Sequence, residues 1–224
     1  ATEDSTRVAD VLAATSAKTN SSIESLGQSF KFAGPVASQL GLKLEDVAAA
    51  LGLAANAGIQ GTVSGRNLAS GFANLVKPTA AATAVMNELG MSFTKIGENG
   101  QKEFKQLPEI IGELQTKLAG LSGPDKIAAI TEIFGKDNVK TWLALISQAP
   151  GEIDKLSGSL QDSAGYAKDL ADARMDSVAG QMKMLGSSAE GLGVAFFEVF
   201  QGDIKNAIKS VIPIVNSLGP VITG

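Results

Sequence analysis

The residues of this chain that could do chemistry are a few carboxylates and one glycine-rich turn. Among the carboxylates, Glu45 stands beside Asp46, and Glu152 is separated by one residue from Asp154. Paired carboxylates can act as general acid and base. Acidic residues are also favoured in the first turn of a helix, where the backbone dipole is positive. Both pairs stand at expected helix starts, so we interpret them as structural.

The chain contains no histidine and no cysteine. Their absence excludes disulfides, zinc sites with Cys or His ligands, and nucleophilic catalysis by a Ser–His or Cys–His pair. Ser64, in the glycine-rich turn, therefore has no histidine to activate it. We predict no enzyme, no catalytic residue, no cofactor and no metal site.

The glycine-rich turn covers residues 58–65. Its glycines match neither G-x-G-x-x-G nor the P-loop, which also needs a Lys-Ser/Thr pair. An Ala/Leu-rich helix enters the turn, and Gly58 suits the left-handed residue that ends a helix, with Ile59 as the apolar contact that follows it. Asn56 precedes this ending. The pattern predicts a helix–Gly–helix corner with a packing role.

The second helix of this corner is expected to start at Thr62, whose hydroxyl can cap the first turn. Leu68, together with Phe72 and Leu75, follows helical spacing and predicts one apolar face. Gly61 and Gly65 would then allow two backbones to approach closely.

Composition bounds the remaining possibilities. The chain has 224 residues, 44% of them hydrophobic but only 5% aromatic, so its core must consist of Ala, Leu, Ile and Val with many thin contacts. A net charge of −4 and a pI near 5.0 argue against sequence-specific nucleic-acid binding. No apolar run reaches the roughly 18 residues of a membrane span. The nearest runs, 192–200 and 204–222, are broken by charged residues and favour core-facing helices.

Helix signals recur along the first 150 residues. Ser5 is a candidate cap for a first helix, Ser21 or Ser22 for a second, and Gly34-Pro35 predicts a break or kink in that second helix. Further helices are expected from Leu107-Pro108, from Asp125, and around Val139 and Trp142. The apolar face of the helix after Asp125 is predicted to contain Ile127, Ile130, Ile133 and Phe134.

Residues 91–104 interrupt this helical pattern. They alternate weakly and contain Asn99-Gly100, which is typical of a β-hairpin turn. An isolated hairpin is marginally stable, so this one must lean on the helices. The predicted fold is therefore all-α, a compact array of short helices with a small β-hairpin near 91–104, followed by longer C-terminal helices.

Pro150-Gly151 is the strongest boundary signal and divides the chain into a helical module, 1–150, and long amphipathic helices, 151–224. In the second part, apolar residues alternate at spacings of four and three, which is a heptad seam. One interpretation is a long helix that packs on its own domain; the other is self-association or a rod that leaves the domain. The seam consists of Ala171, Met175, Val178, Met182, Leu185, Ala189, Leu192, Phe196 and Val199.

Several segments together resemble a known family. The run GPVASQLGLKLEDVAAALGLAANAGIQGTVSGRNLASGFANLVKP is similar to the core region of phage tail tape measure proteins, and ELGMSF…NGQ, LPEIIGELQTKL and ITEIFGKDNV follow in the family's order. The resemblance covers about residues 8–146, and beyond Pro150 only the character of the sequence matches. Its structural fingerprint comprises Asn56, Gly58, Ile59, Gly61, Gly65 and Leu68.

The resemblance implies a structural component of a bacteriophage or prophage tail, part of the protein that sets tail length and is ejected ahead of the DNA. It implies sister copies in a homo-oligomer, with a trimer expected, and as further partners the tail tube and tail tip proteins and the tail assembly chaperones. The implied location is the tail lumen of the virion, and the host cytoplasm during assembly. The chain would be a folded module excised from a longer tape, with the ruler largely outside it. The alternative is a membrane-active segment that assists DNA passage across the host inner membrane.

Overall fold

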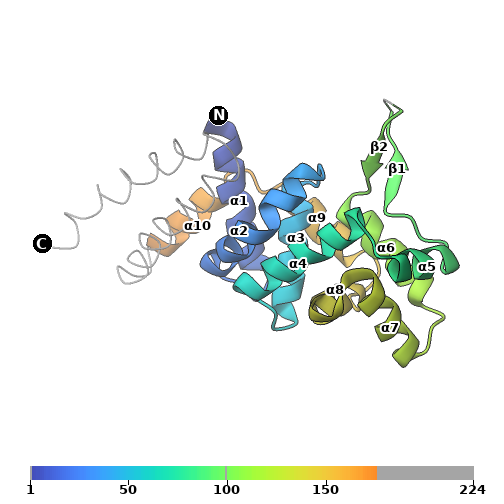
Figure 1. Cartoon of the computed structure of the whole chain (residues 1–224). Helices are drawn as coiled ribbons and strands as arrows, with labels where there is room; N and C mark the ends of the chain where they lie inside the picture. The colour runs from blue at the N-terminus through green and yellow to red at the C-terminus, as the bar shows by residue number, and fades with distance from the viewer. Residues whose placement is uncertain (1, 99, 176–224) are drawn as a thin grey trace, which may run out of the picture.

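The structure is a computed structural model that describes residues 2–98 and 100–175 of the chain. Within these ranges the chain forms ten α-helices, a short 3-10 helix and one two-stranded hairpin (Figure 1). The predicted array of short helices with a small hairpin is confirmed for this part of the chain. The longer C-terminal helices were predicted for residues 151–224. In the described part of that range the chain forms two helices of only ten residues each, Glu152–Gln161 and Tyr166–Met175. The rest of the range, 176–224, lies outside the described residues.

The elements follow one another with short connections. They are α1 (Thr2–Lys18), α2 (Ile23–Gln39), α3 (Leu44–Asn56), α4 (Gly61–Val76), α5 (Ala80–Glu88), β1 (Thr94–Ile96), β2 (Lys102–Phe104), α6 (Leu107–Leu118), α7 (Gly123–Phe134), η1 (Lys136–Asn138), α8 (Val139–Ile146), α9 (Glu152–Gln161) and α10 (Tyr166–Met175).

Helix α3 is the centre of the core. Every residue from Glu45 to Ala55 is buried, and the helix contacts α1, α2, α4, α6, α8 and α9. A helix that is apolar on all sides has to be enclosed by others, and its alanines let those neighbours come close. The core around α3 is rich in Ala and Leu, as expected, but the expectation of a core made only from Ala, Leu, Ile and Val is wrong. The largest fully buried side chains are Trp142, Phe30, Phe72 and Phe134.

Of the predicted break or kink at Gly34-Pro35, the break is wrong. Helix α2 runs without interruption from Ile23 to Gln39, with Pro35 inside it. Proline disfavours helical backbone at the residue before it partly through that residue's Cβ, and Gly34 has none. Phe30, Ala33 and Ala37 are buried on both sides of the proline, so packing holds the helix together there.

Helix starts were predicted with mixed success. Ser22 does cap α2, since its hydroxyl accepts the N–H of Ser25 at 3.0 Å. Ser5 is not a cap but lies inside α1. Helix α4 begins at Gly61 after Gln60, so Thr62 is a helical residue and does not cap. Helix α7 is capped by Ser122, whose hydroxyl accepts the N–H of Asp125, the residue predicted as the cap.

The hairpin at 91–104 is confirmed. Strand β1 pairs antiparallel with β2, with Lys95 opposite Glu103, and Gly100 adopts a φ of 74° in the connecting loop. The hairpin contacts the helices through Lys95 of β1, whose ammonium lies 2.7 Å from the carboxylate of Glu109 in α6. Figure 1 shows the two strands extending away from the helices.

One predicted core residue of α7 is misplaced. Ile130, Ile133 and Phe134 are buried, but 48% of Ile127 is exposed. Ile127 lies one turn before Ile130, near the start of α7, where the helix has less of the core to face. The apolar face is therefore shorter than its sequence pattern.

The residues after Pro150 pack against the residues before it. Helix α9 contacts α3, and α10 contacts α1; Figure 1 shows α10 beside α1. The division of the chain at residue 150 stays a prediction. Among the described residues, no helix is both long and apolar enough to cross a membrane.

Candidate functional site

The helix corner at residues 56–65 has the predicted geometry on its first side. Ile59 donates its N–H to the C=O of Ala54 and Gly58 donates to Ala55, both at 2.9 Å. With a φ of 78° at Gly58, these two bonds form a Schellman ending. Ile59 is buried as the apolar contact of this ending. The corner therefore closes α3 by backbone bonds alone.

Asn56 connects the corner to the loop between α1 and α2. Its side-chain oxygen accepts the N–H of Asn20 at 2.7 Å, while the side-chain amide of Gln60 donates to the C=O of Asn20 at 2.8 Å. The side chains of Asn56 and Gln60 thus bind both the backbone N–H and the backbone C=O of Asn20. This role of Asn56 depends on a partner that is distant in sequence.

At Gly65 the backbone of the corner comes very close to the backbone of another helix. A Cβ placed on it would lie 2.1 Å from the carbonyl oxygen of Ser29 in α2. The hydroxyl of Ser29 in turn donates to the C=O of Gly61 at 2.7 Å. A close backbone contact is present as predicted, but its partner is α2 and not α3, the other helix of the corner.

The apolar face of α4 is also confirmed. Leu68, Phe72 and Leu75 are buried, and they lie on the same face as Gly61 and Gly65. The corner glycines bring α2 against α4, and the larger side chains that follow then enter the core. The role of these residues as a family fingerprint stays a prediction.

A second close contact on α4 was not predicted. Gly71 lies against the indole of Trp142 in α8, and a Cβ on Gly71 would meet the indole nitrogen at 2.1 Å. Trp142 stacks on Phe134 with centroids 3.9 Å apart and meets Phe72 edge-on at 5.8 Å. A glycine inside an otherwise apolar helical stripe was the signal available in the sequence. The sequence pattern did not indicate that Trp142 is the partner of Gly71.

The first carboxylate pair is more deeply buried than a helix cap requires. Glu45 and Asp46 lie in the first turn of α3 as predicted, yet both are buried. The guanidinium of Arg7 in α1 lies 2.6 Å from Glu45, and the hydroxyl of Ser157 in α9 donates to Asp46 at 2.5 Å. Each carboxylate thus joins α3 to another helix, and both partners were missed in the sequence.

Burial raises the pKa of the Asp46 carboxyl above its ordinary value, and the hydrogen bond from Ser157 opposes this increase. A raised pKa can mark an acid catalyst. Among the described residues, however, the groups that act on Asp46 are a serine hydroxyl, a lysine and other acids, and none of them is an activated nucleophile. Glu152 and Asp154 lie in the first turn of α9 as predicted. The geometry supports structural roles for both pairs.

Ser64 is fully buried, and its hydroxyl has no hydrogen-bond partner in the described part of the chain. It lies on the packed face of α4 and not in a cleft. Within residues 2–98 and 100–175, no group of three or more acidic residues is arranged to hold a metal ion.

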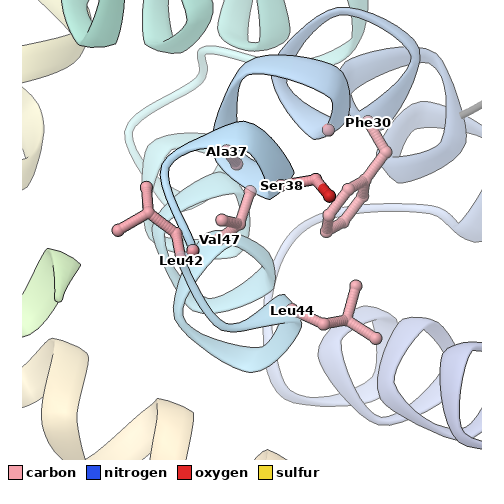
Figure 2. Close-up of a pocket in the computed structure, with 8 residues that line it drawn as sticks. Phe30, Ala37, Ser38, Leu42, Leu44 and Val47 are labelled. Atoms are coloured by element: carbon pink, nitrogen blue, oxygen red, sulfur yellow. The ribbon is translucent and has the colours of Figure 1, made fainter. Parts of the chain in front are cut away.

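A small hollow lies beside the turn between α2 and α3 (Figure 2). Its volume is about 180 Å³, below the roughly 300–1,000 Å³ of ordinary small-molecule sites. Figure 2 shows Ser38 as the polar side chain among apolar ones. The lining residues are Phe30, Gly34, Ala37, Ser38, Gly41, Leu42, Leu44 and Val47. This hollow lacks the convergent polar groups of a ligand site.

The predicted seam cannot be placed in this structure. Ala171 and Met175 belong to α10, whereas Val178, Met182, Leu185, Leu192 and Phe196 lie outside the described residues. Self-association along the seam stays a prediction.

Comparison with known proteins identifies relatives over most of the chain. Residues 1–135 match the family described as phage-related minor tail protein. The tape measure protein of Pneumococcus phage Dp-1 is 31% identical over 217 residues, which cover 96% of this chain and 18% of that protein. The probable tape measure protein of Escherichia phage P2 is 25% identical over 204 residues, which cover 91% of this chain and 25% of the relative. The chain thus spans a quarter or less of the length of these curated relatives. No solved structure matches it.

Proposed function

The chain belongs to the phage-related minor tail protein family, and on this premise we propose that it is a folded packing module of a tape measure protein. The observation that carries the proposal is the family match over residues 1–135, which includes the whole corner. The chemistry of the fold agrees with it, since its glycines and buried acids join helices to one another. The module would contribute to the virion tail as a structural part.

The proposed role is in tail assembly and in setting tail length, followed by ejection ahead of the DNA. A straight helix adds about 1.5 Å per residue, whereas the described residues form short helices, six of which pack on α3, and are far more compact than that. The length-measuring part would therefore lie mainly outside residues 2–175. We propose sister copies, the tail tube and tip proteins and the assembly chaperones as partners, and the tail lumen as its place in the virion.

The test separates a folded module from a simple length of chain. In the phage that encodes the parent protein, Gly65→Leu keeps the number of residues but drives a side chain into the backbone at Ser29. We expect it to destabilise the module by about 1–3 kcal/mol or more, and to reduce the yield of complete tails seen by electron microscopy.

Gly112→Leu is the matched control. Gly112 lies inside α6, and no neighbouring atom lies within 4 Å of the place that a Cβ would take, so leucine should gain about 1 kcal/mol of helix propensity there. Tails should form normally with this variant. Normal yield and length of tails with an unfolded Gly65→Leu module would contradict the proposed role.

The second candidate is a membrane-active segment, and it rests on the apolar runs 192–200 and 204–222 in the sequence. Such a segment would act after ejection, at the host inner membrane. Flotation of the chain with lipid vesicles, lost when residues 191–224 are removed, would favour this candidate.

A further inference from the structure

Helices α9 and α10 are attached to the body in different ways. Helix α9 inserts Ile153 and Leu160 into the core, and its Ser157 bonds to the buried Asp46. By contrast, every side chain described in α10, from Tyr166 to Ala173, is exposed or only half-buried. Apolar burial scales with the area removed from water, so it holds α9 far more strongly than α10.

Tyr166 packs against the edge of the core, and one carboxylate of α1 binds the backbone at the start of α10. Asp10 is 2% exposed; its Oδ2 accepts the N–H of Gly165 and its Oδ1 accepts the N–H of Ala167, both at 2.8 Å. The first amides of a helix have no partner within it, and a carboxylate there also complements the helix dipole. Asp10 therefore caps α10 from another helix, with two charge-assisted hydrogen bonds.

The connection between α9 and α10 contains a turn at which α10 can rotate relative to α9. The hydroxyl of Ser163 donates back to the C=O of Leu160 at 2.6 Å, which closes the end of α9. Gly165 follows with a φ of 81°, a conformation that glycine adopts at little cost. A rotation at Gly165 would move α10 without disturbing the bond that ends α9.

We propose that α10 is a releasable strap and that Asp10 is the hook that holds it on α1. When the hook opens, α10 leaves α1 while α3, α4 and α9 stay folded. The chain continues beyond Met175 into residues 176–224, which the structure does not describe. This inference concerns a conformational change of the fold and does not depend on the proposed role in the tail.

Hydrogen exchange of the unmodified chain gives the first test. Local opening exposes amides in proportion to the population of the open form. We expect the amides of α10 to exchange faster than those of α9 and α3. Equal protection in α9 and α10 would overturn the proposal, because the two helices would then open together.

Asp10→Ala gives the second test, with Asp172→Ala as its control. Two hydrogen bonds to a charged group are removed in Asp10→Ala, so α10 amides should exchange at least about tenfold faster, with those of α3 and α9 unchanged. Asp172 pairs with Lys168 on the exposed side of α10, and its loss should change exchange only slightly.

Two results would overturn the assignment of Asp10 as the hook. One is unchanged exchange in α10 of Asp10→Ala. The other is faster exchange throughout the chain, since Asp10 would then stabilise the whole fold and not the strap. Asp10→Asn, which keeps one acceptor oxygen, should fall between the wild type and Asp10→Ala.

Discussion

Asp46 shows how a single residue can both join two helices and cost stability. Its carboxylate accepts a hydrogen bond from Ser157, but burial raises its pKa above 3.8. The folded state therefore binds the proton more tightly than the unfolded state does. The contribution of Asp46 to stability is complete below pH 3.8 and is lost as the pH rises through the raised pKa.

Asp46→Asn should make this loss visible. The variant has no charge to bury, so the free energy of unfolding of the wild type should fall relative to that of the variant as the pH rises above 3.8. Urea unfolding of both proteins between about pH 3 and 7 measures this difference. If the stability of the wild type relative to the variant stays constant or rises with pH, the carboxylate is not penalised in the fold.

Ser157→Ala is the control for this experiment. The hydroxyl of Ser157 lowers the pKa of Asp46, so its removal should raise that pKa further. The loss of stability with rising pH should then extend over a wider range than in the wild type.

The conformations of single residues were easier to predict than their partners. The left-handed backbone of Gly58 follows from a local pattern, because an Ala/Leu helix followed by Gly-Ile has one common ending. The partners of Gly65, Asn56 and Asp46 are Ser29, Asn20 and Ser157. Nothing in the neighbouring sequence names them, since these contacts depend on how whole helices are arranged.

At the scale of elements, the periodicity of apolar residues gave the helices and the hairpin, while signals for their ends were less reliable. Hydroxyl residues occur both as caps and inside helices, and only packing decides between the two roles for Ser5 and Thr62. The proline of α2 failed as a stop signal for the same reason. Tertiary contacts on both sides of it outweigh a local cost.

Pro35→Ala tests that cost. Pro35 is exposed and lies inside α2, so alanine would restore a backbone donor and remove the ring at little loss of packing. The gain in helix propensity is about 3 kcal/mol, reduced by about 1 kcal/mol for the greater freedom of the unfolded chain. We expect the variant to be more stable by about 2 kcal/mol in thermal or urea unfolding. A loss of stability would mean that the proline ring has a packing role.

At the scale of the whole molecule, the sequence did not predict how the segments before and after Pro150 meet. Helix α9 joins the same core as α3 through Ile153 and Leu160, and α10 lies on α1 through Asp10. Proline and glycine mark a local turn, but a turn does not prevent the following helix from packing back. The two interpretations of the seam are packing on the body and self-association. Both involve α10, because this helix lies on α1 and contains Ala171 and Met175, the first two seam residues.

Val178→Asp tests self-association along the seam. In a heptad seam, Val178 would face a partner helix, and a charge there should weaken that contact strongly. We expect sedimentation to show association of the wild-type chain with rising concentration, toward the mass of a trimer, and dissociation of the variant at the same concentration.

Ser187→Asp is the matched control, because it adds the same charge at a position that the predicted heptad pattern places opposite the seam. It should leave the association unchanged. A wild-type chain that stays monomeric at high concentration would refute self-association, and so would equal effects of the two variants, since charge alone would then explain the result.

Release of α10 should affect the association, if the chain associates, because α10 contains Ala171 and Met175 at the start of the seam. Asp10→Ala, which frees α10 from α1, should then strengthen the association, as fewer contacts within one chain would compete with those between chains.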